Sequence, residues 1–414
     1  MSRRVYWLWL AEKQELDAAV IRRLTESFGT PEFLYASERD VLLSAGLTKR
    51  QTDALCEKDL SRAEHILRVC EQKKITIVTI EDSAYPDALR EIADPPPVLY
   101  VRGTLPDFER MPAISVVGTR SCSAYGLRMA ERFGAALAKA GFSIVSGMAH
   151  GIDTAAHQGC LKAGGKTVAV LAGGVDICFP KENQYLMGDI MLCGAVISEN
   201  PPGTANEGFR FPLRNRIITG LSAATLIVEA PVRSGAMISA RLAFEQGREV
   251  FAIPGALDVA GSVGCNRLIR DEIARIATHP MDIVHELASM LRQKPQEELV
   301  RSVWLRELGG YGSLPAPEPV KPYRIARSSG GRRTASGEKE QKQEETAEPL
   351  QEKKLPDSLS DTQRKIAQAI GAGADTIDAI SEATGLPAAE IASALVLLEL
   401  AGVAAQKAGR CILL

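Results

Sequence analysis

The sequence predicts an α/β protein with a doubly wound, largely parallel sheet, a helical N-terminal domain and a C-terminal winged helix. Three observations predict it: strand-like runs that alternate with helical stretches, amphipathic helices before them, and a final segment patterned as three helices and two strands. The strand-like runs are β-branched or apolar and cover residues 114–117, 142–145, 167–171, 195–197, 225–228 and 249–252. Strands that alternate with helices form parallel sheets, so a Rossmann-like core is expected.

Residues 1–70 are predicted to form a small helical domain of the helix-hairpin-helix or SAM-like kind. Apolar residues recur there at helical spacing, as at Leu16 and Val20. Residues 42–50 resemble a helix-hairpin-helix turn, in which Gly46 permits the tight bend and backbone amides meet phosphate. Simple helix packing explains the same residues, so the sequence leaves both roles open.

The core domain is expected to span residues 71–290 and to begin with a β-rich connector. Residues 75–79 form one predicted strand of this connector, and a proline run leads into a second at 98–101. Residues 291–356 are predicted to be a disordered, charged linker. Their second half, 328–354, is polar and has almost no aliphatic content, so it lacks the means to form a core.

Residues 357–414 are predicted to form a winged helix, that is, three helices and a two-stranded wing. Ser360 is placed to cap the first helix. The domain holds seven acidic and four basic residues, and the third helix, 388–400, has no Lys or Arg. Because phosphate attracts the opposite sign, we do not expect this domain to be the main part of the chain in any binding of nucleic acid. Its apolar residues would serve protein contact or form the domain's own core; they are Leu395, Leu397, Leu398 and their neighbours.

Composition limits the class of protein. A chain of 414 residues that is 45% hydrophobic has room for two or three domains. It has no apolar run long enough to span a membrane and no signal-peptide cleavage site, so a cytoplasmic protein is expected. The eight cysteines are scattered without metal-ligand spacing, so reduced thiols and no metal are expected. The formal net charge of -2 means that any nucleic-acid site must be local.

The first strand of the core ends in a loop suited to phosphate. Gly118, Thr119 and Arg120 follow the strand, and a helix is predicted to begin near Ala124. Ligands gather at the carboxyl ends of parallel strands, where glycine allows close approach and helix N-termini attract anions. The dinucleotide fingerprint is absent, because Arg120 and Ser123 stand where its second and third glycines would be.

A nucleotide-hydrolysing P-loop is also missed. Gly165, Lys166 and Thr167 resemble its end, but Cys160 occupies the position of its first glycine. Thr167 also opens a strand where the motif requires a helix. We therefore expect no cofactor, no metal and no nucleotide hydrolysis.

The segment after the second strand invites a catalytic interpretation. It runs from Ser146 and Gly147 through His150, Asp153 and His157. Neither histidine has a cysteine or second carboxylate at ligand spacing, and Asp153 is placed to cap the following helix. A structural role is therefore favoured over a catalytic one.

The densest binding signal lies between residues 209 and 222. It combines cations and an amide with aromatic rings: Phe209, Arg210, Phe211, Arg214, Asn215 and Arg216. Cations suit phosphates and rings suit bases, although a surface salt-bridge cluster has the same composition. After the next strand, Arg233 would join the same rim, and Ser234 is placed to cap the helix that Gly235 begins.

Short motifs follow one another along the core. They cover residues 117–120, 146–153 with 155–157, 173–176 with 179–183, 198–199, 211–218, and 234–235 with 254–255. In these motifs and in their order, the chain resembles the DNA-processing protein A (DprA/Smf) family. The resemblance implies a homodimer that binds and protects single-stranded DNA and helps to load the RecA recombinase in natural transformation. It implies no catalytic reaction and no membrane. It places the strand over a basic pocket containing Arg120, Lys181, Arg214 and Arg216.

Together, these observations predict a single-stranded-DNA site at the carboxyl end of the sheet. Its predicted residues are Gly118, Thr119, Arg120, Ser146, Gly147, Lys181, Phe211, Arg214, Asn215, Arg216, Arg233, Ser234 and Gly235. The alternative is a Rossmann-like nucleotide-phosphate hydrolase, for which Glu199 and Glu229 are the candidate carboxylates. A scaffold that recruits partners and binds DNA incidentally is a third interpretation.

Overall fold

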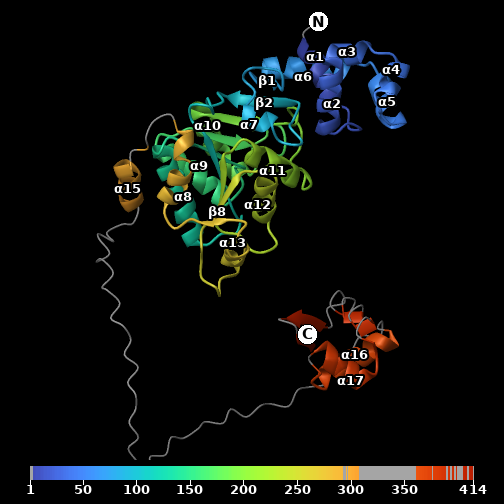
Figure 1. The fold of residues 1–414 in the computed structure, drawn as a ribbon, viewed down its shortest axis with the longest axis vertical. Helices are drawn as coiled ribbons and strands as arrows, with labels where there is room; N and C mark the ends of the chain where they lie inside the picture. Colours follow the sequence, from blue (N-terminus) through green and yellow to red (C-terminus); the bar gives the residue numbers. More distant parts are fainter. Residues whose placement is uncertain are drawn as a thin grey trace, which may run out of the picture. The chain divides into compact units, whose positions relative to one another are not determined.

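The chain forms two compact units that divide at residue 321, and each is described by itself (Figure 1). The computed structural model describes residues 3–291, 295, 297–306, 360–374, 376–387, 390, 391, 394, 395, 398, 404–407 and 410–413.

The first unit begins with the expected small helical domain. Its helices are α1 (Arg3–Ala11), α2 (Ala18–Phe28), α3 (Pro31–Ala36), α4 (Arg39–Ser44), α5 (Lys49–Cys56) and α6 (Ser61–Gln72). Gly46 adopts φ 76° in the turn between α4 and α5, a left-handed conformation that favours glycine. Thr48 then begins α5 with a capping box, in which its hydroxyl accepts from the Gln51 backbone. Trp7, Leu8 and their neighbours bury the apolar side of the domain.

A nine-stranded sheet forms the core, in the order β1-β2-β6-β5-β4-β3-β7-β8-β9. The strands are β1 (Thr76–Thr79), β2 (Val98–Gly103), β3 (Ala113–Val117), β4 (Ser143–Ser146), β5 (Thr167–Val170), β6 (Ala195–Ser198), β7 (Ala224–Ile227), β8 (Glu249–Ala252) and β9 (Arg275–Ile276). Only the β1–β2 and β2–β6 pairs are antiparallel. The doubly wound, Rossmann-like sheet is therefore confirmed. The short edge strand β9 was not expected.

The strand order reverses at β3. β4 pairs with one edge of β3, and β7 pairs with the other. The loops that leave the carboxyl ends of β3 and β7 consequently run to opposite faces and open a crevice between them. In doubly wound sheets this switch point is where ligands bind.

Helices cover both faces of the sheet (Figure 1). Along β3, Val116 packs with α8 (Ala124–Lys139), α9 (Ile152–Lys162) and α14 (Pro280–Glu286), while Val117 packs on the other face. That other face carries α11 (Arg210–Gly220), α12 (Gly235–Glu245) and α13 (Ala260–Arg270). The remaining short elements are α7 (Asp87–Arg90), η1 (Lys181–Asn183), α10 (Gln184–Cys193) and η2 (Ala288–Met290).

One part of the expected linker is folded. Residues 291–356 were predicted to be disordered, but α15 (Glu297–Arg306) packs against α8. The centre of the Trp304 ring lies 5.1 Å from the centre of the Phe133 ring. The Cζ atom of Arg132 lies 4.1 Å from the centre of the Trp304 ring. The prediction missed this helix because its apolar positions are few and because the residues that it contacts, on α8 and α14, are distant in the sequence. Residues 307–359 lie outside the described residues.

The second unit contains α16 (Asp361–Gly371), α17 (Ile377–Thr384) and an antiparallel pair, β10 (Ala404–Lys407) and β11 (Arg410–Leu413). Ser360 caps α16 as expected, through a capping box with Gln363. The third expected helix lies only partly within the described residues, which are helical at 390, 391, 394, 395 and 398. Leu395 and Leu398 are buried with Ile366 and Ile380, so they belong to the core of this unit.

Candidate nucleic-acid interface

A groove of about 510 Å³ opens at the switch point, between the loops that follow β3 and β7. Both loops, the start of α12 and one side of α11 contribute to it. Its lining comprises Val117, Gly118, Thr119, Arg120, Ser121, Ala149, Asp153, Gly208, Phe211, Pro212, Arg214, Asn215, Ile218, Pro231, Arg233, Ser234, Gly235, Ala236, Ile238 and Ser239. The structure thus brings most of the predicted site residues together from distant parts of the chain.

Two exposed arginines stand at the groove, one on each loop. The Arg120 guanidinium lies 4.7 Å from the Phe211 ring centre, and that ring lies 5.5 Å from the ring of Phe179. Arg233 extends from the loop after β7. Within the described part of the chain, neither arginine forms a salt bridge. The groove therefore offers two cations to phosphate, and a ring beside one of them.

The helix N-terminus expected to bind phosphate after β3 is already occupied. Glu229 is buried and accepts hydrogen bonds from the Ser123 backbone N–H at 3.1 Å and from its hydroxyl at 2.7 Å. A carboxylate at this position satisfies the positive end of α8. The expectation of an anion site at the start of α8 is therefore corrected.

The N-terminus of α12 faces the groove instead. Ser234 occupies the predicted N-cap position, but its side chain makes no capping hydrogen bond. Its buried Oγ has no partner among the described residues. Gly235 and Ala236, in the first turn, also line the groove. The uncapped positive end of an 11-residue helix is thus directed at the groove.

Arg214 lies in the floor of the groove and is only 4% exposed. It donates to the carbonyl oxygen of Gly147 at 2.9 Å and to that of Val170. Burial lowers the pKa of Arg214 to about 10, and the nearby Asp153 carboxylate opposes this shift, so the guanidinium remains charged at neutral pH. Both hydrogen-bonded partners of Nη1 are backbone carbonyls, so this nitrogen is already used within the protein, and the contact of Arg214 with phosphate stays a prediction.

Asp153 lines the same groove as Arg214, and the two side chains hold opposite ends of the same residue, Gly147. Its carboxylate accepts from the backbone N–H groups of Gly147 at 3.1 Å and Ala149 at 3.4 Å. Burial raises the pKa of Asp153, while Arg214 and these hydrogen bonds oppose the rise. Gly151, not Asp153, is the N-cap of α9. Ser146 and Gly147 are buried too. These two predicted DNA contacts therefore belong to the structure that lies beneath the groove.

Arg216 does not line the groove. Its Nε lies 2.8 Å from Oδ2 of Asp94 and its Nη2 lies 2.6 Å from Oε2 of Glu199. Positions 214 and 216 are two residues apart on α11, so their side chains leave different sides of the helix. The salt-bridge interpretation thus holds for Arg216, and its predicted contact with phosphate is corrected. Lys181 is exposed on η1, outside the groove lining but two residues after Phe179.

The residues proposed for catalysis have structural partners. Glu199 binds Arg216, and Glu229 binds Ser123. His157 is buried, and its Nδ1 lies 2.7 Å from the Thr167 hydroxyl, which confirms the structural interpretation of this histidine. His150 is exposed at the surface.

No helix among the described residues has the length and apolar character needed to cross a lipid bilayer. The same residues contain no cluster of three or more His, Cys, Asp or Glu side chains arranged to hold a metal ion.

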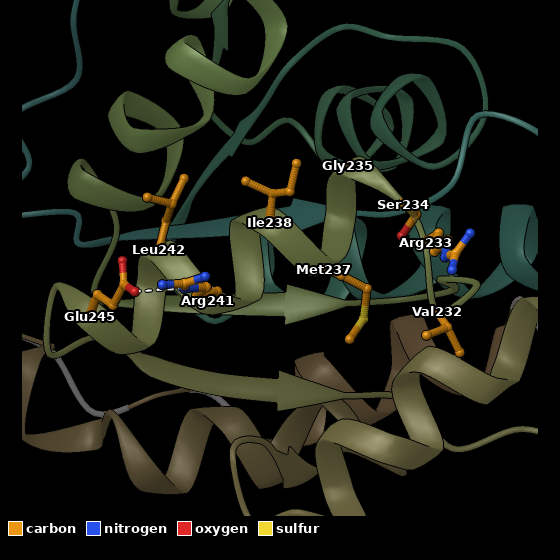
Figure 2. Close-up of a pocket in the computed structure, with 9 residues that line it drawn as sticks. All are labelled: Val232, Arg233, Ser234, Gly235, Met237, Ile238, Arg241, Leu242 and Glu245. Atoms are coloured by element: carbon orange, nitrogen blue, oxygen red, sulfur yellow. Dashed lines mark hydrogen bonds and ion pairs between the residues drawn. The ribbon is translucent and has the colours of Figure 1, made fainter. Parts of the chain in front are cut away.

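The groove continues along α12 into an open cleft of about 730 Å³ (Figure 2). Arg233, Ser234, Gly235 and Ile238 line both spaces. Beyond them the cleft is bordered by the apolar side chains Val232, Met237 and Leu242 and by the Arg241–Glu245 ion pair. The sequence did not single out Ile238 or the cleft. The available signal was the four-residue spacing of Ile238 and Leu242, which also describes a buried helix face.

Comparison with known families adds independent evidence. A family model described as DNA recombination-mediator protein A matches residues 76–288, and one described as DprA winged helix domain matches residues 350–410. The chain belongs to the DNA-processing protein A (DprA/Smf) family. This confirms the resemblance drawn from the motifs. It also confirms the winged helix as a domain of the chain.

Relatives in the family match either nearly the whole chain or a large part of it. Protein Smf of Synechocystis sp. is 32% identical over 416 residues, which cover 99% of this chain and 98% of that protein. DNA processing protein DprA of Streptococcus pneumoniae is 43% identical over 216 residues, covering 52% of this chain and 76% of that protein. The crystal structure of the S. pneumoniae protein matches with a TM-score of 0.59 and 34% identity, over 69% of this chain and 98% of that chain.

Proposed function

We propose that this member of the DprA/Smf family binds single-stranded DNA in the switch-point groove, without catalysing a reaction. In the fuller form of this proposal, it protects the strand in the cytoplasm, acts as a homodimer and helps to load a RecA recombinase. Family membership supports the DNA-processing role. Seven cysteines whose side chains the structure describes are free thiols, the state that a reducing compartment maintains.

One observation carries the proposal: the groove combines free cations, an aromatic ring and an uncapped helix N-terminus. Arg120 and Arg233 provide charge for phosphates, and the end of α12 adds backbone donors at Gly235 and Ala236. The Phe211 ring offers a base a stacking surface at the same place. An unpaired strand presents phosphates and base faces together, whereas a duplex hides its base faces.

The hydrolase alternative loses support at the same site. The carboxylates named for this alternative would have to act as a general base on water in the groove. Glu229 is held at the start of α8 and does not line the groove, and Glu199 is paired with Arg216. Asp153 does line the groove, but it already accepts two hydrogen bonds from the backbone N–H groups of Gly147 and Ala149.

The test is a binding titration with single-stranded and duplex DNA over a series of salt concentrations. We compare the parent with Arg120→Glu and Arg233→Glu, and with Arg110→Glu as a matched control. Arg110 is exposed and precedes β3, so it lies at the opposite edge of the sheet. Each groove variant should bind single strands more weakly, and the salt slope should fall by about 0.7 for each lost phosphate contact.

The control should bind like the parent. Groove variants that melt like the parent and bind single strands with unchanged affinity and slope would refute the proposal. The helical N-terminal domain would then be the leading candidate for the DNA site.

A further inference from the structure

The aromatic surface of the groove depends on how α11 is held. Phe211 and Asn215 line the groove from this helix. Phe209, the N-cap residue of α11, makes no side-chain capping bond, so local capping does not fix the first turn. The Arg120 guanidinium stacks on Phe211, so the position of α11 also affects the cation that neighbours the ring.

Arg214 ties α11 to the ends of two neighbouring strands. Its guanidinium donates to the carbonyl oxygen of Gly147, the residue after β4, and to that of Val170, the last residue of β5. The guanidinium lies so close to Gly147 that a Cβ there would collide with it. A planar, buried guanidinium with two carbonyl acceptors defines both the distance and the rotation of the helix.

The same arginine lies against a loop in an unusual conformation. Met148 adopts φ 55° and Gly151 adopts φ 77°. Asp153 accepts from the backbone on both sides of Met148, and Asn183 donates to the Met148 carbonyl at 2.9 Å. A non-glycine residue in the left-handed region is retained only where its surroundings hold it. This support loop, residues 147–151, carries Ala149 into the groove lining.

We propose that Arg214 and Asp153 form a buried positioning pair for single-stranded-DNA binding. Arg214 does not contact phosphate; it holds Phe211 on α11 and the support loop in the arrangement that the strand requires. This inference rests on the proposed function. Preorganisation of this kind reduces the cost of ordering a site when the ligand binds.

The test measures binding of a labelled oligothymidine to the full chain over a salt series. Arg214→Met and Arg214→Lys are compared with Arg120→Ala, and a thermal melt accompanies each variant. Arg216→Met is the matched control. It removes a guanidinium from the same helix, but this guanidinium does not line the groove. We expect both Arg214 variants to bind about tenfold more weakly with the salt slope of the parent.

The lysine variant separates charge from geometry. Both carbonyls accept from one guanidinium nitrogen, Nη1, of a planar and buried group. Lysine keeps the positive charge, but its Nζ stands on a shorter, flexible stem without that planar group, so we expect it to restore little affinity. Arg120→Ala should instead lower the salt slope by about 0.7. The Arg216→Met control is expected to melt at a lower temperature and to bind like the parent.

Three outcomes would overturn the inference. A slope reduced by about 0.7 in Arg214→Met would make Arg214 a phosphate contact. A lower melting temperature with parental affinity would leave it a purely structural role. Full rescue by lysine would show that charge alone matters. If Arg214→Met does not fold, Asp153→Asn decides, with weaker binding at parental slope expected. If the parent binds no single strands, the proposed function itself fails.

Discussion

Glu229→Gln distinguishes a structural carboxylate from a catalytic one. Glu229 is 7% exposed and accepts hydrogen bonds from the backbone N–H and the hydroxyl of Ser123. Ser123 is the N-cap residue of the 16-residue helix α8. Glutamine keeps the volume of the side chain and one acceptor oxygen, but it removes the negative charge from the positive end of the helix. The substitution should therefore reduce the stability of the core and leave DNA binding intact.

The expected loss follows from two contributions. A hydrogen bond to a charged group contributes about 1.5–3 kcal/mol, and a charge at a partly buried helix end contributes up to about 2 kcal/mol. Since glutamine retains one acceptor, we expect a net loss of about 2–3 kcal/mol. For a unit of roughly 300 residues the loss corresponds to a decrease in Tm of about 3–5 °C.

Calorimetry of the full chain measures this change, with Glu245→Gln as the matched control. Glu245 is an exposed partner in the Arg241 ion pair, so its substitution should cost at most about 0.5 kcal/mol. Single-strand affinity of Glu229→Gln should match the parent. An unchanged Tm, together with a nucleotide-hydrolysing activity that the variant loses, would refute this reasoning and restore the hydrolase alternative.

Three further predictions concern pH, strand length and the winged helix. Burial lowers the pKa of His157 to about 3 from its ordinary 6.5, so only the unfolded chain gains this proton as the pH falls below 6.5. Stability should fall by about 1.4 kcal/mol per pH unit between pH 6.5 and 5, and chemical denaturation should show less dependence in His157→Gln. We expect longer single strands to continue from the groove into the cleft along α12. In binding titrations, Ile238→Asp should therefore weaken the binding of strands of about 16 nucleotides more than that of strands of about 4 nucleotides, whereas Phe244→Asp, an exposed position of α12 outside the cleft lining, should not. Equal losses for both strand lengths would contradict this path. Truncation near residue 355 should leave most single-strand affinity, and a folded truncation that loses it refutes this expectation.

Local patterns predicted the core strands because each strand carries its own signal. Residues 114–117 and 225–228 are apolar and β-branched, and both became buried central strands, β3 and β7. The winged-helix cap at Ser360 was equally local, since a capping box lies within four residues. By contrast, α15 depends on the distant Phe133 ring, and no local pattern reveals that contact.

The candidate site was predictable in its place but not in the role of each arginine. The strand-end rule brings Arg120 and Arg233 to one groove whatever their neighbours are. Arg214 and Arg216 look equivalent in the sequence, yet one binds strand-end carbonyls and the other binds two carboxylates. These partners of Arg214 lie 67 and 44 residues away in the sequence and those of Arg216 lie 122 and 17 residues away, beyond the span of a helical or strand pattern.

By itself, the sequence determined the alternation of strands and helices, the absence of both nucleotide fingerprints and the motif order that identifies the family, because each of these is a property of short segments. Only the tertiary structure decided which charges remain free. Glu229 closes the end of α8, whereas Ser234 leaves the end of α12 uncapped, and these opposite outcomes depend on packing between β3, β7 and their helices. A charged group binds a ligand only if no closer partner already neutralises it, and the fold alone determines which partners are close.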